Sequence, residues 1–244
     1  YPVRAVVRRR DARAERLDRL GVETVVADLH DPDQMTAALR DVQRVYYLPP
    51  IAPHGLHAAA AFAAAAQVTR PEAVVQMSQW LAQPAHPSIV TREMWLIERM
   101  FATLPGTLHI VLDPGMFADN FLRVLDFATL LRIYPVLMGE SRSAPVATED
   151  IARVAAELLA NPARHAGRRY RPTGPALLSG REMAAVIARV LGHPVMPVDL
   201  PFWLFRKVAR MTGVDPHEVM SFRDYIADHR AGAFSFEGGV TDVV

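Results

Sequence analysis

Short hydrophobic runs alternate with longer amphipathic segments along the first part of the chain. β-branched and aliphatic residues predict strands over 3–7, 23–27, 45–48, 73–77 and 108–112. Apolar residues at helical spacing predict helices over 12–20, 56–68, 90–103 and 120–131, with a further helix starting near residue 31. This alternation is typical of βαβ units, so we expect an α/β protein with a doubly wound parallel sheet and helices on both faces.

Local signals fix the ends of several predicted helices. Gly21 follows the first helix as a C-terminal stop. Asp31 is an expected N-cap, with Pro32 at the first helical position and Gln34 three residues after the cap.

From Gly139 onward, the regular alternation of predicted strands and helices is lost. We expect helices over 149–159, 181–191, 202–211 and 217–227, with short strands over 168–171 and 195–198. The chain therefore divides into a main domain, residues 1–140, and a smaller α+β lobe, residues 141–244, that interleaves with it. Trp203, Phe205 and Met211 are interpreted as core residues of this lobe.

Composition narrows the class of protein. Half of the 244 residues are hydrophobic (51%), and the formal net charge is +1, which favours neither nucleic acid nor an anionic membrane as partner. There is no cysteine, so disulfides, thiol catalysis and Cys-type zinc sites are excluded. The longest apolar run, over 58–66, is too short to span a bilayer. We expect a cytoplasmic protein.

Polar residues that directly follow strands are the first candidates for ligand binding, because ligands of doubly wound sheets bind at the carboxyl ends of the strands. Arg8, Arg9 and Arg10 follow the first strand, where an arginine can hold the 2′-phosphate of NADP; the alternative is a solvated cationic strand end. Asp28 follows the second strand. Its carboxylate either accepts a hydrogen bond from an adenine or serves the turn, and taken alone the turn is favoured.

Ser78 follows the fourth predicted strand, the place of the catalytic serine in short-chain dehydrogenases. Those enzymes also need a Tyr and a Lys four residues apart on the next helix, where the Tyr supplies a proton. Residues 90–103 contain neither, and Lys207, in the far lobe, is the chain's single lysine. Ser78 is therefore a weak catalytic candidate, and no other catalytic residue is identified.

Two further groups have only positional support. Trp80, Met116 and Phe117 follow strands and are interpreted as lining a substrate pocket. His54 and His57 share a helix face at a spacing that metals can use, but no third ligand is evident. We interpret this pair as marking the entry to a helix and predict no metal site.

Several segments together resemble the NmrA-like branch of the atypical short-chain dehydrogenase superfamily. Each is a weak motif, but they occur in the right order over nearly the whole chain: 3–8, 26–32, 45–50, 114–120, 144–152 and 170–175 with Leu178-Ser179.

The resemblance implies a Rossmann-type fold that binds NAD(P), with NADP expected first and NAD left open. It places Arg8, and beside it Arg9, at the 2′-phosphate. Residues 28–29 (Asp28, Leu29) would border the adenine, and residues 49–50 (Pro49, Pro50) together with Ser78 the rest of the dinucleotide.

Two functions are compatible with this resemblance. The first is an NAD(P)H-dependent oxidoreductase that acts on a small organic, quinone-like acceptor. The alternative is a non-catalytic, NADP-binding redox sensor that binds a regulatory protein partner. A homodimer is left open.

The family opens with a strand and a Gly-x-x-Gly-x-x-Gly turn whose backbone N–H groups bind the pyrophosphate. Neither occurs in this sequence, and in strand order 3-2-1-4-5-6 the missing strand is the central one. We expect that the chain is N-terminally truncated by one strand–turn–helix unit, roughly thirty residues. A further alternative is a fragment that does not bind the cofactor.

Overall fold

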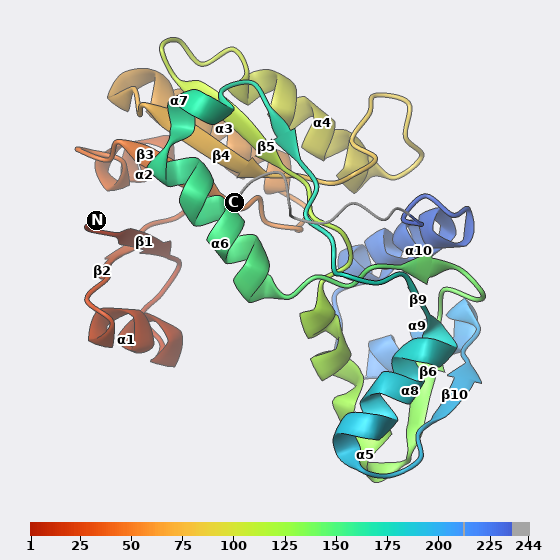
Figure 1. Cartoon of the computed structure of the whole chain (residues 1–244). Helices are drawn as coiled ribbons and strands as arrows, with labels where there is room; N and C mark the ends of the chain where they lie inside the picture. Colours follow the sequence, from red (N-terminus) through yellow and green to blue (C-terminus); the bar gives the residue numbers. More distant parts are fainter. Residues whose placement is uncertain (212, 236–244) are drawn as a thin grey trace.

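The computed structural model describes residues 1–211 and 213–235 (Figure 1). The strands are β1 (Arg4–Val7), β2 (Glu23–Val26), β3 (Arg44–Tyr47), β4 (Ala73–Met77), β5 (Leu108–Leu112), β6 (Ile133–Val136), β7 (Arg142–Ser143), β8 (Arg169–Tyr170), β9 (Leu178–Ser179) and β10 (Met196–Asp199). The helices are α1 (Ala12–Arg19), α2 (Pro32–Ala38), α3 (Gly55–Thr69), α4 (Ile89–Phe101), the 3₁₀ helix η1 (Ala118–Val124), α5 (Leu125–Leu130), α6 (Thr148–Ala160), α7 (Pro162–His165), α8 (Gly180–Leu191), α9 (Phe202–Met211) and α10 (Pro216–Arg230).

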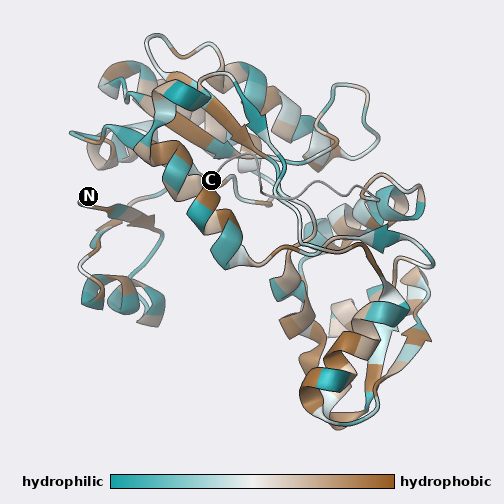
Figure 2. Cartoon of the chain, viewed as in Figure 1, coloured by the Kyte–Doolittle hydropathy of each residue, from teal (hydrophilic) through white to brown (hydrophobic). Residues whose placement is uncertain are grey.

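The main sheet is four-stranded and parallel, in the order β3-β4-β5-β8. On one face Val74 packs with α3 and α4 around Phe62 and Phe101. On the other face Val75 and Ile110 pack against α6. All five residues of β4 are buried, as expected for a central strand covered on both faces, and Figure 2 shows this part of the sheet as hydrophobic.

β1 and β2 form a separate two-stranded parallel sheet. Val6 of β1 packs against the edge of the α3/α4 core, but no residue of β1 is fully buried. Within the described residues, β1 pairs only with β2 and β3 pairs only with β4, so each of β1 and β3 has one unpaired edge.

The predicted helix signals act as expected at α2. The carboxylate of Asp31 accepts hydrogen bonds from the backbone N–H groups of Asp33 and Gln34, and Pro32 opens the helix. The side-chain amide of Gln34 donates back to Asp31 (2.7 Å). This cap fixes the turn that follows β2.

The lobe is built around β6 and β10, which pair in parallel, together with α5 and α8. β6 lies before residue 140, while α6 and β8, which follow it, belong to the main sheet. The chain thus passes from the main sheet to the lobe and back (Figure 1).

Three expectations about the second half of the chain are wrong. The segment predicted as one helix over 120–131 is split into η1 and α5. Trp203 and Met211 are not core residues, since they are 63% and 79% exposed; only Phe205 packs, against Phe202 and Phe222. An amphipathic pattern alone does not say whether a lobe supplies a partner for the apolar face.

No helix in the described part of the chain is both long enough and apolar enough to cross a membrane.

Candidate functional site

The strands of each sheet run in parallel, so the carboxyl ends of β1 and β2 lie side by side, as do those of β3, β4 and β5. Arg8 and Arg9 follow β1, Asp28 and Leu29 follow β2, Pro49 and Pro50 follow β3, and Ser78 follows β4. The candidates identified from the sequence therefore come to the strand ends at which a doubly wound sheet binds its ligands.

A cavity of about 530 Å³ opens where β1 ends. It is lined by Val6, Val7, Arg8, Arg9, Asp11 and Arg13. Arg13 is paired with Asp11 at 2.8 Å, whereas Arg8 and Arg9 have no ion pair or side-chain hydrogen bond among the described residues. Two uncommitted guanidinium groups beside a cavity can bind a phosphate through parallel N–H bonds.

Asp28 lies close enough to Arg8 for that positive charge to act on it. Its carboxylate accepts hydrogen bonds from the backbone N–H of His30 (3.0 Å) and from the His30 ring (2.8 Å). These bonds, with a smaller contribution from Arg8, lower the pKa of Asp28. Asp28 thus orders the turn after β2, and its carboxylate is ionised next to the cationic cavity.

Three histidines gather beside this turn. The ring of His30 lies 6.2 Å from the ring of His54 and 5.8 Å from that of His57. His54 is the N-cap residue of α3, and His57 Nε2 lies 3.3 Å from the His30 carbonyl oxygen. No group of three or more His, Asp or Glu residues in the described chain is arranged to hold a metal ion. Sequence reasoning paired His54 with His57 and missed His30, which comes from another strand end.

The turn after β3 needs a glycine. A Cβ at Gly55 would lie 2.5 Å from the carbonyl oxygen of Pro50, which is far inside van der Waals contact. Pro49 and Pro50 end the strand, and Gly55 lets α3 begin directly against them. This close approach was not identified from the sequence, because Gly55 lies in an otherwise unremarkable helix start.

Ser78 is buried and its hydroxyl is already engaged. Its Oγ donates a hydrogen bond to Glu98 of α4, which is 1% exposed. Glu98 also accepts from Arg169 of β8. A hydroxyl that donates to a buried carboxylate has no proton left to offer to a substrate, so the structure adds no support for Ser78 as a proton donor.

The same network continues to the end of β5. Asp113, fully buried, accepts hydrogen bonds from Arg169 (2.7 Å) and Arg171 (3.1 Å), and Arg171 also donates to the carbonyl of Trp80 (3.2 Å). Burial raises the pKa of Asp113, and the two arginines act against that rise. Glu98, Asp113, Arg169 and Arg171 were all missed in the sequence. The available signal was an acid at a core-facing position of an amphipathic helix.

Three residues were expected to line a substrate pocket, and each lies in different surroundings in the structure. Trp80 is 8% exposed and lies 5.7 Å under the guanidinium of Arg171. Met116 packs in the lobe core, and Phe117 packs against the α6 face of the main sheet. Their role at a substrate pocket stays a prediction.

In the sequence, the turn over 114–117 runs into a helix, and Asp119 at its start predicts a cap of that same helix. Instead its carboxylate accepts a hydrogen bond from the backbone N–H of Thr148 (3.2 Å), at the first residue of α6. η1 begins after Phe117 with no side-chain cap. The acid therefore stabilises the start of a helix that is distant in sequence.

Together, the parallel sheets, their helix-covered faces and the cationic cavity at a strand end define a Rossmann-type α/β protein. No family model matches the chain. It is 30% identical over 221 residues to the NAD(P)H azoreductase of Xenophilus azovorans, covering 90% of this chain and 75% of the relative. The chain belongs to the family of this azoreductase.

A second relative is the (4-alkanoyl-5-oxo-2,5-dihydrofuran-3-yl)methyl phosphate reductase of Streptomyces griseus, 30% identical over 95% of this chain and 80% of the relative.

Solved structures agree on the fold. The NADPH-dependent quinone oxidoreductase of Escherichia coli, complexed with NADPH, superposes with a TM-score of 0.81 at 21% identity, over 96% of this chain and 81% of that one. The triphenylmethane reductase of Citrobacter sp., complexed with NADP(H), gives a TM-score of 0.83 at 17% identity, over 99% of this chain and 85% of that one.

Proposed function

We propose that this protein is an NAD(P)H-dependent oxidoreductase that reduces a small conjugated acceptor such as a quinone or an azo compound. The observation that carries the proposal is membership in the azoreductase family together with uncommitted Arg8 and Arg9 beside a cavity at the end of β1.

The residues at this edge fit a phosphorylated dinucleotide in charge and position. Arg8 and Arg9 would hold the 2′-phosphate of NADP, Asp28 and Leu29 would border the adenine, and the segment of Pro49 and Pro50 would line the path toward Ser78. The cofactor supplies hydride transfer when bound. The protein supplies binding and orientation.

The acceptor class follows from the missing proton donor. The helix that follows Ser78, α4, contains no Tyr/Lys pair, and the Ser78 hydroxyl donates to Glu98. Quinone-like and azo acceptors suit such a site, because water can protonate their reduced heteroatoms without a dedicated side chain.

The missing Tyr/Lys pair on α4 and the hydrogen bond from Ser78 to Glu98 also favour a second candidate, a non-catalytic redox sensor of the NmrA type. A cofactor site without a Tyr/Lys pair and without a free Ser78 hydroxyl also suits a protein that only reports the cofactor's state to a protein partner.

We also infer that the intact protein carries one further strand between β1 and β3. Each of these strands pairs on one side only, and unpaired backbone edges inside a sheet are costly. The curated relatives are longer than this chain, which covers 75% and 80% of them. Reading the upstream DNA in frame tests the inference; an immediate stop codon or an unrelated sequence would refute it.

Titration of the full-length protein with NADPH and NADP⁺, followed by turnover assays with quinones and azo compounds, decides between the two functions. Binding with turnover supports the oxidoreductase. Binding without turnover on any acceptor supports the sensor, and no binding overturns both.

Arg8 has its own test. If it contacts the 2′-phosphate, Arg8→Ala weakens NADPH binding about tenfold or more and leaves NADH binding nearly unchanged, since a charge-assisted contact contributes roughly 1.5–3 kcal/mol. Arg16→Ala, on the exposed side of α1, is the matched control and should change neither affinity. Equal losses for both cofactors in Arg8→Ala contradict the phosphate role.

A further inference from the structure

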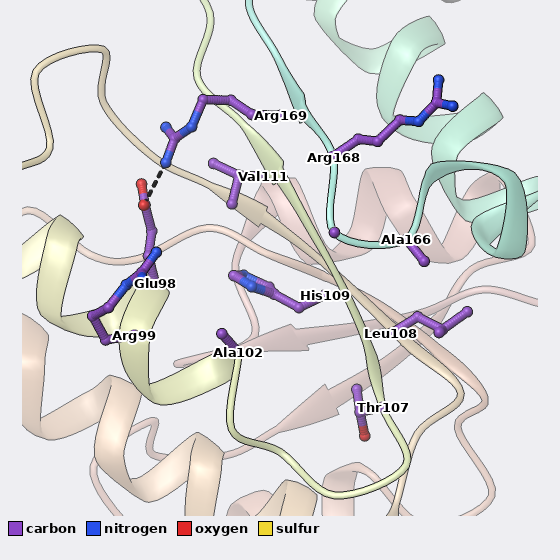
Figure 3. Close-up of a pocket in the computed structure, with 11 residues that line it drawn as sticks. Glu98, Arg99, Ala102, Thr107, Leu108, His109, Val111, Ala166, Arg168 and Arg169 are labelled. Atoms are coloured by element: carbon purple, nitrogen blue, oxygen red, sulfur yellow. Dashed lines mark hydrogen bonds and ion pairs between the residues drawn. The ribbon is translucent and has the colours of Figure 1, made fainter.

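A second cavity, of about 370 Å³, lies between α4, β5 and β8. Its walls are the last turn of α4, the first half of β5 and the residues that lead into β8 (Figure 3). Because these are the amino ends of β5 and β8, the cavity opens away from the strand ends that precede Arg8 and Ser78. It is distinct from the cofactor cavity.

The lining carries a surplus of positive charge. Arg169 is neutralised by Glu98 and Asp113. Arg99, in the last turn of α4, has no hydrogen bond or ion pair with any residue that the structure describes. In Figure 3 the side chains of Arg99 and His109 point toward one another across the cavity, while Arg168 points away from its rim.

The end of α4 does not cancel this charge. The carbonyl end of a helix carries about half a negative charge, which is less than the full charge of Arg99. Glu98, the other acid at the cavity, is already paired with Arg169. The cavity therefore keeps a positive potential.

The pKa of His109 responds to this positive potential. The Nε2 atom of His109 lies 2.9 Å from Oε1 of Gln76, which fixes the ring. Burial, and to a smaller extent the charges of Arg169 and Arg99, together lower the pKa of His109 to about 4. The imidazole is thus neutral near pH 7, and an anion beside it would favour its protonation.

We propose that this cavity binds a small oxyanion, the phosphate or carboxylate group of a small molecule, through Arg99 and His109. Guanidinium and imidazolium groups donate charge-assisted hydrogen bonds to such oxygens. Binding of an anion beside His109 favours the protonated imidazole, so the pKa of His109 is higher in the bound form. Arg99, Arg168, Arg169 and Glu98 are the charged groups that line the cavity around this imidazole.

The experiment is a titration of the full-length protein with inorganic phosphate, and separately with succinate, followed through the histidine side-chain signals by NMR. The expected result is a saturable shift of the His109 signal and a higher pKa for His109 in the bound form. A response to phosphate alone identifies a phosphate site, and a response to both probes identifies a general oxyanion site. No saturable response of His109 to either probe overturns the proposal.

Variants locate the site. Arg99→Gln should weaken binding about tenfold, the loss expected for one charge-assisted contact. His109→Gln should also weaken binding, because it removes the imidazole that donates to the anion. Arg189→Gln, an exposed arginine of α8 in the lobe, is the matched control and should bind like the native protein. Equal weakening by Arg99→Gln and Arg189→Gln would overturn the site.

The proposal does not rest on the proposed oxidoreductase function. Arg8→Ala should leave phosphate binding at His109 unchanged while weakening NADPH binding, so failure of either proposal is seen separately.

Discussion

The β1–β2 sheet and the four-stranded sheet, both parallel, contain similar β-branched sequences but are buried to very different degrees. β4 is buried at all five positions, between α3 and α4 on one face and α6 on the other. β1 is only partly buried along its length, and β2 is exposed at both ends and partly buried at the two positions between them. The difference comes from the neighbours that each strand has.

Arginines at the first residue of a strand show the same contrast. Arg44 of β3 donates to the carbonyls of Leu159 and Ala160, at the end of α6, and so joins elements distant in sequence. Arg4 of β1 reaches the carbonyls of Ala38 and Arg40 and stays within the N-terminal part. The four-stranded sheet is therefore held by long-range contacts, and the two-stranded sheet mainly by local ones.

The largest expected consequence is a difference in local stability. Backbone amides of β4 should exchange with solvent only on global unfolding, whereas those of β1 and β2 should exchange through local opening. We expect protection to differ by a factor of about a thousand or more, because local and global opening differ by several kcal/mol. Hydrogen exchange followed by NMR measures this; equal protection would show that both sheets form one cooperative unit.

Truncation of a buried side chain should give the second-largest difference between the two sheets, measured as a loss of the free energy of unfolding. Phe62 is 1% exposed and its ring lies 4.6 Å from that of Tyr47. Phe62→Ala should lower the free energy of unfolding by about 3–5 kcal/mol, through lost burial and the cavity left behind. Val7→Ala in β1 is the comparison and should cost about 1 kcal/mol or less, since Val7 is only partly buried. Urea denaturation distinguishes them, and similar losses would contradict the comparison.

The buried ion network adds a specific contribution to the four-stranded sheet. Asp113→Asn keeps the side-chain shape but removes the charge that faces Arg169 and Arg171, and should lower the free energy of unfolding by about 3 kcal/mol. Asp150→Asn removes an exposed partner of Arg153 and should cost less than about 1 kcal/mol. If thermal or urea denaturation gave both variants the same small loss, the network would not stabilise the sheet.

The most gradual expected effect is the pH dependence of stability. Burial lowers the pKa of His229 from 6.5 to about 4, so the folded state binds fewer protons than the unfolded state between these values. The contribution of neutral His229 to the free energy of unfolding is fully present above pH 6.5. It falls as the pH drops toward 4, by up to about 1.4 kcal/mol per pH unit. His229→Phe, which keeps the stacking on Phe234, should make this fall shallower, although His109 contributes with the same sign. An unchanged slope in urea denaturation across this pH range would show that His229 is not the group responsible.

The strand-end residues could be predicted because they follow directly from chain order. Once the βαβ rhythm is recognised, Arg8, Asp28 and Ser78 must come to the carboxyl ends of their strands, whatever their side-chain contacts. Asp31 and its cap were also readable, since capping joins residues three positions apart.

The contacts of these residues could not be predicted in the same way. Ser78 meets Glu98 only because α4 packs across β4, and His30 meets His54 only because two loops from different strands approach each other. Asp119 caps α6, a helix that begins far along the chain, rather than its own. Each contact joins segments whose separation in sequence leaves no local periodic signal.

The sequence by itself determined the class of fold, the order of strands and helices as far as β5, and which residues follow each of those strands, because these depend on hydrophobic period and turn chemistry. Tertiary structure decided which arginines are neutralised and which remain free. Arg169 is paired with Glu98 of α4 and with Asp113 directly after β5, whereas Arg8, Arg9 and Arg99 form no ion pair among the described residues. The physical reason is that a charge acquires its function from the groups within a few ångströms of it, and those groups come from distant parts of the chain.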